Sequence, residues 1–329
     1  MNKKIIYTML IVLGVLLVFW VVLKNTGGPT TQPESLTALD IQFDAGKAAK
    51  IDVYKQEYPD SGLHFAKIDT SWVVTNAFNA PAKSSEIVKF LADLDSVSGQ
   101  IRAESADLYE DFDITDERAL QIEIFDSEGS KLLHIYVGKG SGGQANFLRV
   151  AGSPTVYLAD RNFISRFAAW NAEPERKLPT SRWVELSLCS IPREMVKSFA
   201  LKMNNKEFGF ALIEEPVEDS LAPPTEVWTQ VMPEKGTKLD EGKIKRLQST
   251  VVSLRATDVA DPANMSKFGL ENPAYSVSAA DNSGRTVQIY FSKPFNSDKD
   301  RYVVVDGVNA LYMIKENTFN RIFEDPFKE

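Results

Sequence analysis

Cysteine is almost absent from this chain of 329 residues, which contains only one, Cys189. One cysteine cannot form an intrachain disulfide, so the stability of the fold must come from packing. The run from Leu186 to Leu188 before it indicates a small buried side chain and not a nucleophile or a metal ligand. With 43% apolar and 25% charged residues the chain can bury sizeable cores, and its length suggests about two domains.

Histidine is nearly as scarce, since only His64 and His134 occur and both fall within strand patterns. A Ser-His-Asp or Cys-His mechanism needs a histidine beside a nucleophile and a third group that orients it, and no spacing here indicates one. Positive charge is not in excess either, because 45 acidic residues outnumber 37 basic ones and give a net charge of −8. This balance argues against nucleic acid as a partner and against binding of anionic lipid through a basic face.

The chain does contain one long apolar run, at its start. Residues 5–23 carry no charge, and these 19 residues are about enough for a membrane-spanning helix, which needs roughly 20. Lys3 and Lys4 precede the run, and the positive-inside rule places that end in the cytoplasm. We therefore expect residues 1–24 to form a cytoplasmic tip and a single-pass anchor in the cytoplasmic (inner) membrane, followed by a flexible tether over residues 25–37.

The competing interpretation of this run is a cleaved signal peptide. The exit from the run, Val21 to Asn25, lacks a small-x-small cleavage site. No cysteine lies near the exit, which excludes a lipoprotein. The sequence therefore favours an uncleaved anchor, and we expect the chain after Lys24 to be extracytoplasmic or periplasmic.

The remainder of the chain repeats itself. Three pairs of residues are separated by 156 positions: Trp72 and Trp228, Leu91 and Leu247, and Phe112 and Phe268. Six further pairs are separated by 155: Gly129 and Gly284, Phe147 and Tyr302, Gly152 and Gly307, Tyr157 and Tyr312, Asn162 and Asn317, and Arg166 and Arg321. Turn-forming residues recur together with apolar ones, so the pattern indicates a duplicated domain.

Each copy is predicted to be an α+β domain with a mainly antiparallel sheet and helices on one face. We expect repeat domain 1 over residues 38–169, an inter-repeat connection over 170–194 and repeat domain 2 over 195–329. Three matched pairs mark the ends of the predicted helices: Ser84 and Asp240 as N-caps, Ser105 and Asp261 as N-caps, and Asp113 and Gly269 as left-handed C-terminal residues.

A glycine-rich loop from Gly138 to Gly143 contains a lysine and so invites a comparison with phosphate-binding loops. It lacks the GxxxxGK[ST] spacing and leads into a strand, whereas a phosphate cradle leads into a helix N-terminus. The matched segment from Ser292 to Ser297 keeps the lysine and has no glycine. A hairpin connection is therefore the favoured interpretation.

An acidic stretch from Asp107 to Glu117 could attract a calcium ion. It does not fit the calcium-loop pattern, and the matched stretch in the second copy is not acidic. A solvated helix and turn is therefore favoured. The sequence identifies no catalytic residue, no cofactor and no metal ligand, although folding could still bring two carboxylates together for acid–base chemistry.

The tryptophans divide into two groups. Trp72 and Trp228 are matched between the copies and are predicted to belong to the cores. Trp170 and Trp183 fall in the connection between the copies, where an exposed aromatic side chain would be a candidate for binding a partner.

The run Phe268-Gly269-Leu270-Glu271-Asn272-Pro273, followed by a strand, a glycine turn, Tyr302-Val303 and Leu311-Tyr312, resembles a bacterial domain family of unknown function. The resemblance covers roughly residues 50–323. It implies a membrane-anchored envelope protein with a duplicated domain, and some members are associated with ABC exporters of the gliding-motility type. The first copy departs from the pattern, with Phe112-Asp113-Ile114-Thr115-Asp116 and no proline, so its membership rests on the internal repeat. The family supplies no catalytic residues.

These observations predict a non-catalytic, membrane-anchored scaffold or accessory protein that binds other envelope proteins. Subunits of an ABC-type exporter are among the candidate partners. The alternative is an extracytoplasmic module that binds a solute or a glycan, and a distant third is an envelope hydrolase that uses carboxylates. A deep cleft between the copies, lined by aromatic residues, would favour the second function.

Overall fold

The computed structural model describes residues 37–39, 41, 43–141, 143, 145–170, 175–215, 225–234 and 238–328. The predicted anchor at residues 5–23 and the predicted tether up to residue 36 lie outside the described residues. Within the described part of the chain, no helix is long and apolar enough to cross a membrane. Two antiparallel sheets with a few helices give the predicted α+β architecture.

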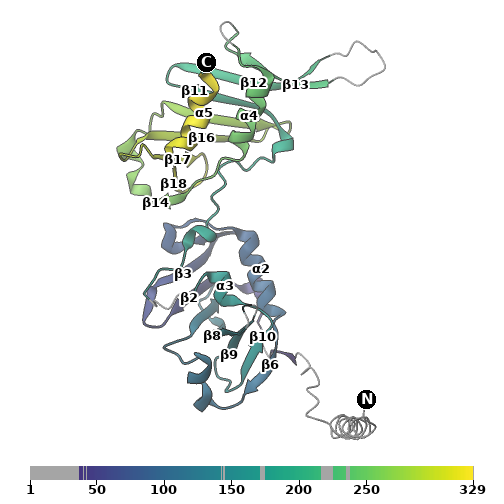
Figure 1. Ribbon diagram of the computed structural model, residues 1–329, viewed down its shortest axis with the longest axis vertical. Coiled ribbons are helices and arrows are strands. Elements are labelled where there is room, and N and C mark those ends of the chain that lie inside the picture. Colours follow the sequence, from purple (N-terminus) through teal and green to yellow (C-terminus); the bar gives the residue numbers. More distant parts are fainter. Residues whose placement is uncertain are drawn as a thin grey trace, which may run out of the picture.

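We call residues 37–185 and 186–328 the first and second unit, since each is built around one sheet (Figure 1). The strands of the first unit are β1 (Thr37–Ala38), β2 (Lys50–Lys55), β3 (Tyr58–Ile68), β4 (Ser71–Val74), β5 (Ala80–Pro81), β6 (Ser98–Ala103), β7 (Leu120–Phe125), β8 (Lys131–Ser141), β9 (Ala145–Val150) and β10 (Val156–Ala159). Its helices are α2 (Ser84–Asp95) and α3 (Phe163–Phe167), with short 3-10 turns η1 (Ala45–Lys47), η2 (Thr75–Ala77), η3 (Ala106–Leu108), η4 (Glu110–Phe112) and η5 (Thr180–Arg182).

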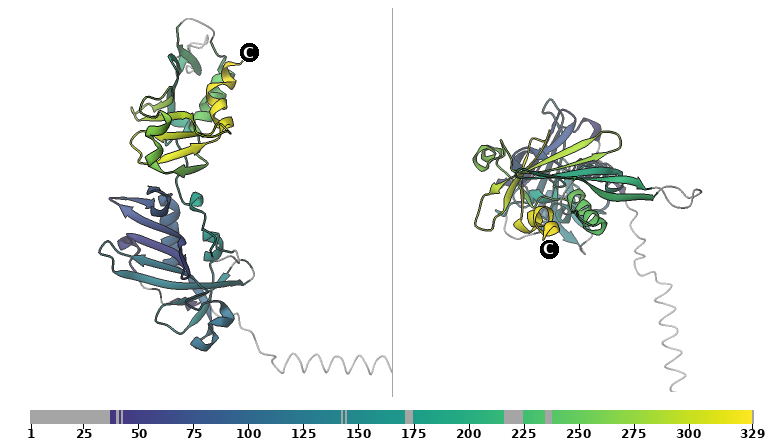
Figure 2. Two further views of the ribbon diagram at one scale, coloured as in Figure 1. Left: turned by 90° about the vertical axis from the view of Figure 1, so that its left-hand side faces the viewer. Right: turned by 90° about the horizontal axis from the view of Figure 1, so that it is seen from above.

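The second unit repeats this series of elements. Its strands are β11 (Val196–Met203), β12 (Lys206–Glu215), β13 (Thr225–Met232), β14 (Asp258–Ala260), β15 (Tyr275–Asp281), β16 (Thr286–Pro294), β17 (Arg301–Val305) and β18 (Leu311–Ile314). Its helices are α4 (Glu241–Val252) and α5 (Glu316–Phe323), with 3-10 turns η6 (Arg193–Met195), η7 (Pro262–Asn264), η8 (Ser266–Phe268) and η9 (Asp325–Phe327). Both helices lie on the same side of the sheet (Figure 2).

The two sheets have the same topology. Among the described residues the first sheet has the strand order β1-β6-β10-β9-β8-β7-β2-β3-β4-β5, and the second has the order β13-β12-β11-β15-β16-β17-β18-β14. Read from β14, the second order matches β6 to β4 strand by strand, and only β1 and β5 are additional. The matched tryptophans lie on matched strands, Trp72 on β4 and Trp228 on β13, and both are buried. The duplication inferred from the sequence is therefore present in the fold.

The core of each unit lies between its sheet and its helices. In the first unit, Ile51 and Val53 of β2 share one buried cluster with Ile87 and Phe90 of α2. The side chains between them on β2, such as Asp52, face the other side, because successive residues of a strand alternate. The first sheet therefore has one apolar face under its helices and one polar face.

The helices match in a register one residue away from the predicted one. The buried residues of α2 are Ile87, Phe90, Leu91 and Leu94, and those of α4 are Ile244, Leu247, Gln248 and Val251. The first and last members of these sets differ by 157 positions, so Phe90 and not Leu91 is the counterpart of Leu247. The pairing of Leu91 with Leu247 was therefore wrong, since both helices present two adjacent buried positions there.

The predicted helix caps are confirmed at five of six positions. Ser105 and Asp261 cap η3 and η7, and Asp113 and Gly269 have left-handed backbones after η4 and η8, with φ of 54° and 78°. Asp240 caps α4 by accepting a hydrogen bond from the backbone of Lys243 at 2.8 Å. Ser84 is not a cap, because α2 begins at this residue after Lys83 and has no side-chain cap.

The segment between the units is ordered by both of them. Val184 pairs with Ala82 of the first unit, and Ser187 pairs with Arg255 of the second, so the chain passes from one unit to the other within about three residues. The stretch predicted as an inter-repeat connection, 170–194, therefore includes residues that pack into each unit.

Candidate functional site

Trp170 is the exposed aromatic residue that the sequence placed between the copies. The helix α3 ends at Ala168, whose backbone is left-handed with a φ of 55°. The backbone N–H of Ala169 donates to the carbonyl of Ile164 at 2.8 Å and closes the helix end. The chain then leaves the helix, and the Trp170 side chain is 61% exposed.

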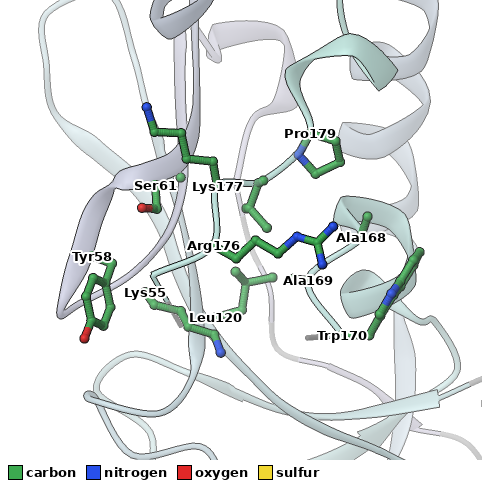
Figure 3. Close-up of a pocket in the computed structure, with 12 residues that line it drawn as sticks. Lys55, Tyr58, Ser61, Leu120, Ala168, Ala169, Trp170, Arg176, Lys177 and Pro179 are labelled. Atoms are coloured by element: carbon green, nitrogen blue, oxygen red, sulfur yellow. The ribbon is translucent and has the colours of Figure 1, made fainter. Parts of the chain in front are cut away.

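A pocket of about 280 Å³ lies beside Trp170 (Figure 3). Its walls come from the β2–β3 turn, the start of β7, the end of α3 and residues 176–179. Two hydrogen bonds fasten this last segment to β3, from the Ser61 hydroxyl to the carbonyl of Glu175 at 2.8 Å and from the Leu178 N–H to the carbonyl of Ser61 at 2.8 Å. We call this cavity the Trp170 pocket.

The charge of the Trp170 pocket is opposite to that of the chain. Lys55, Arg176 and Lys177 line it, and its lining among the described residues includes no carboxylate. Figure 3 shows Arg176 extending across the pocket, between Tyr58 on one side and Trp170 on the other. The whole chain has a net charge of −8, so this local excess of cations is a distinct feature. Cations beside aromatic rings suit a ligand that carries both an anionic and an apolar group.

A second hollow, of about 780 Å³, adjoins the Trp170 pocket and shares Lys55, Leu120, Ala169 and Trp170 with it. The glycine-rich loop and the acidic stretch both contribute to its lining, through residues that include Gly138, Lys139, Gly140, Gly143, Asp113 and Glu117. Three features that are far apart in the sequence therefore meet at one place on the first unit. Each of them is absent from the second copy.

Neither of the two loops has the features of the ligand site that its composition suggested. The glycine-rich segment is the end of β8 and its hairpin to β9, as predicted, with Ser141 paired to Ala145. In the acidic stretch, Asp113 forms an ion pair with Arg118 at 3.1 Å and Asp116 forms one with Arg149. Within the described residues, no group of three or more His, Cys, Asp or Glu side chains could hold a metal ion.

Trp183 does not offer an exposed ring, and its selection as a partner-binding candidate needs correction. Only 3% of the residue is exposed. Its ring stacks on Phe167 with centroids 5.1 Å apart and contacts the edges of Phe65 and Phe90. Trp183 is thus a core residue of the first unit, because the chain after Pro179 turns back into that core.

Cys189 lies in the second unit and is buried, as the sequence predicted. Burial raises the pKa of its thiol. A thiol with a raised pKa is less often ionised and therefore less reactive.

A row of ionisable side chains that sequence reasoning missed crosses the polar face of the first sheet. His64 of β3 pairs with Asp52 of β2, Asp52 pairs with Glu123 of β7, and Glu123 pairs with His134 of β8. Both histidines of the chain thus belong to one row of four directly opposed residues. No pattern along the chain indicates this row, because it depends on the register between four strands.

The two halves of the row differ in their electrostatics. His64 Nδ1 lies 2.8 Å from an oxygen of Asp52, and its Nε2 lies 3.0 Å from the carbonyl of Pro59. Both neighbours accept hydrogen bonds, which favours the doubly protonated ring, and the bond to Asp52 raises the pKa of His64. Burial raises the pKa of the Asp52 carboxyl, but hydrogen bonds from His64 and Lys50 together outweigh it, so this pKa is lowered.

His134 has the opposite behaviour. Its Nε2 lies 3.0 Å from the side-chain oxygen of Gln121, and its Nδ1 lies 3.5 Å from Glu123. Burial lowers the pKa of His134, and the nearby Lys131 and Arg149 lower it further, against the attraction of Glu123. The neutral ring is therefore favoured in the folded protein.

We expect the two histidines to have opposite effects on the pH dependence of stability. His64, with its pKa raised above the ordinary histidine value of 6.5, stabilises the fold below about pH 6.5, and this contribution is lost as the pH rises through the raised pKa. His134, with its pKa lowered from 6.5, stabilises the fold above about pH 6.5, and this contribution is lost as the pH falls. Urea unfolding at about pH 5.5 and about pH 8 measures both effects.

In that measurement His64→Gln should lower the free energy of unfolding more at the acidic pH than at the alkaline one. His134→Gln should lower it more at the alkaline pH. Cys189→Ser serves as a control that leaves the pH dependence unchanged across this range. Shifts of the same sign for both histidine variants would contradict the ion pairing described above.

The second sheet has no such row at the matched positions. Ala200 of β11 pairs with Gly209 of β12 and Ser278 of β15, and Ser278 pairs with Gln288 of β16. The ionisable row, like the Trp170 pocket, therefore belongs to one copy alone. The two units share their frame and differ in the chemistry of their surfaces.

Comparison with known protein families agrees with the repeated frame. The family model described as "Domain of unknown function (DUF4340)" matches the chain twice, over residues 72–260 and 228–327. The two overlapping matches begin at Trp72 and Trp228, the matched tryptophans, and together extend over well more than half of the chain. No curated protein and no solved structure matches the chain. The chain therefore belongs to the family described as Domain of unknown function (DUF4340), which it contains as two overlapping copies.

Proposed function

We propose that this protein is a non-catalytic, membrane-anchored scaffold or accessory protein that holds another envelope protein at the Trp170 pocket. In this proposal residues 5–23 anchor the chain in the cytoplasmic membrane, and both units are extracytoplasmic or periplasmic. The partner is an envelope protein, and subunits of an ABC-type exporter are the first candidates. Neither a cofactor nor nucleic acid takes part.

The observation that carries this proposal is the 61% exposure of Trp170 between two hollows that are lined by residues of the first unit. Large aromatic residues next to recesses are frequent anchors of protein interfaces. The units agree in topology and core and differ in the surface features around Trp170. Selection for a shared reaction would preserve matched polar residues in both copies, whereas an assembly surface requires only that the frame persist.

A module that binds a solute or a glycan is the second candidate function. The specific support for it is the recessed form of the Trp170 pocket, about 280 Å³, with three cations and two aromatic rings around it. This volume is near the lower limit of small-molecule sites, which favours a protruding group of a larger partner over a whole ligand.

A hydrolase that uses carboxylates is the third candidate. Asp52, which folding brings within 2.8 Å of His64, has a lowered pKa. A general acid needs a raised pKa, so this arrangement suits an ion pair better than acid catalysis.

The experiment is affinity purification of the full chain from solubilised membranes, with quantification of the proteins that co-purify. Trp170→Ala should reduce recovery of the specific partner about tenfold or more, because truncation of an interface anchor costs roughly 2 kcal/mol or more. Val88→Ala is the matched control, since Val88 lies on α2 of the same unit and is 59% exposed. His64→Gln, His134→Gln and Cys189→Ser should leave recovery unchanged.

Two results would contradict the proposal. One is full recovery of the partner with Trp170→Ala, which would place the interface elsewhere. The other is retained partner binding together with loss of biological function in His64→Gln or His134→Gln, which would indicate an active site on the polar face of the first sheet.

A further inference from the structure

A hollow with a strong excess of positive charge lies between the two units. Its volume is about 540 Å³, and we call it the interunit hollow. The residues that line it are Lys83, Glu86, Lys89, Arg166, Ser181, Arg182, Trp183 and Arg255. Seven of these residues come from the first unit, and Arg255 comes from the second.

The backbone on both sides of the interunit hollow is held by the crossing segment. The N–H of Lys83 donates to the carbonyl of Trp183 at 2.7 Å, and the Lys83 ammonium donates to the carbonyl of Arg182 at 2.8 Å. On the other side, Arg255 pairs with Ser187, and the N–H of Ala256 donates to the carbonyl of Leu186 at 2.8 Å. Arg255 is therefore brought to the first unit by a short, hydrogen-bonded path and not by a loose contact.

The charges in the interunit hollow are not balanced within it. Arg166 is neutralised by an ion pair with Asp93 at 2.5 Å. Of the remaining charged residues in the lining, Lys83, Lys89, Arg182 and Arg255 are cationic and Glu86 is anionic. The lining of the hollow is therefore net positive, although the whole chain has a net charge of −8.

A further observation favours an oxygen-bearing anion. The N-terminus of α2, a helix of 12 residues, has no side-chain cap and follows Lys83, which lines the hollow. Its first N–H groups and its dipole favour negative charge.

We propose that the interunit hollow binds a phosphate group. Arginine forks and lysine ammonium groups both recognise phosphate, and several cations favour a doubly charged oxyanion over a single carboxylate. The phosphate belongs either to a soluble phosphorylated compound or to a phospholipid headgroup. This inference is independent of the proposed function, since the Trp170 pocket and the interunit hollow have no lining residue in common.

The test uses the full chain purified in a neutral detergent. Inorganic phosphate is titrated at constant ionic strength and followed by ³¹P NMR, with sodium acetate as the singly charged control. Arg182→Gln and Arg255→Gln should each weaken phosphate binding about tenfold, the usual cost of losing one charge-assisted hydrogen bond. Arg246→Gln is the matched control, because Arg246 is an exposed arginine of α4 that does not line the hollow.

A second measurement identifies the source of the phosphate. The phosphorus content of lipid that co-purifies with the chain should fall in Arg182→Gln and Arg255→Gln, and not in Arg246→Gln, if a phospholipid headgroup occupies the hollow. Phosphate binding without such retained lipid assigns the site to a soluble phosphorylated compound. Two results overturn the proposal: neither phosphate binding nor retained lipid, or equal effects of all three arginine variants.

Discussion

Replacing Trp72 or Trp228 by alanine should lower the free energy of unfolding of its own unit by about 3–5 kcal/mol, as the loss of a large core side chain does. Trp72 is 5% exposed and Trp228 is 7% exposed, on matched strands of two sheets with one topology. The Trp228 ring packs against Phe199 with centroids 5.3 Å apart. The space left by either side chain cannot close easily, because both tryptophans belong to the buried hydrophobic core.

Urea unfolding followed by circular dichroism measures this effect. Each variant should move one unfolding transition to lower urea and leave the other in place, since few residues connect the two units. Trp170→Ala is the control, because removal of a side chain that is 61% exposed should change stability by less than about 0.5 kcal/mol. A change below about 1 kcal/mol in either core variant would contradict the matched burial of the two tryptophans.

The repeated frame was predictable because its signals are local. Glycines in turns, caps at helix ends and alternating apolar residues each act within a few positions, and the sequence carries them twice. Gly129 and Gly284, for example, both have left-handed backbones in tight turns, with φ of 83° and 86°. Matched residues of this kind fix matched local structures, and from these the shared topology follows.

The residues of β6 and β14 carry little signal that would mark them as strands. In β6, from Ser98 to Ala103, only Gly99 and Ala103 are buried, so no apolar alternation marks it. It is held in place by its neighbours β1 and β10. The counterpart in the second unit, β14, has three residues. Strands that depend on pairing with distant segments cannot be recognised from a short window of sequence.

The candidate site, like the fold, was predictable only in part. Sequence reasoning selected Trp170, and the fold places it between two adjoining hollows. The larger hollow is also lined by residues of the acidic stretch and of the glycine-rich loop, for which the sequence favoured no binding role. Sequence reasoning also selected Trp183, which the chain folds into the core of the first unit. Whether an aromatic residue after a domain is exposed depends on where the chain turns next, and composition does not determine that.

The row of His64, Asp52, Glu123 and His134 was beyond sequence reasoning for a related reason. Its members lie up to 82 positions apart, from Asp52 to His134, and only the register of the sheet aligns them. A shift of one residue in any of these strands would move its member of the row to the opposite face.

The second large effect concerns Gly138, for which we expect Gly138→Ala to lower the free energy of unfolding of the first unit by about 3 kcal/mol or more. A methyl group at this position would overlap the backbone carbonyl of Phe112 and the side chain of Ile114. The carbonyl cannot move by a change of rotamer, so the whole turn after η4 would have to shift. Ile114 is fully buried in a small cluster with Ala103 and Val156, and that cluster would be disturbed.

Gly140→Ala is the matched control two residues further along β8. Its methyl group would lie 3.5 Å from the carbonyl of Ala145, which is an ordinary contact, so stability should change by less than about 0.5 kcal/mol. Equal effects of the two substitutions in urea unfolding would contradict this account.

The second unit shows why glycine is needed at position 138. Gly138 follows Val137 in β8, and its counterpart in the second unit is Ser292, which follows Phe291 in β16. Ser292 is buried and donates its hydroxyl to the carbonyl of Lys293 at 2.6 Å. The shared frame therefore accepts a side chain at this position. Only the first unit packs Phe112 and Ile114 so closely against β8 that glycine is required. If Gly138→Ala lowers the free energy of unfolding much more than Gly140→Ala does, Gly138 is required for the packing of the wall beside Trp170. A phosphate-binding role is then not needed to explain the glycine.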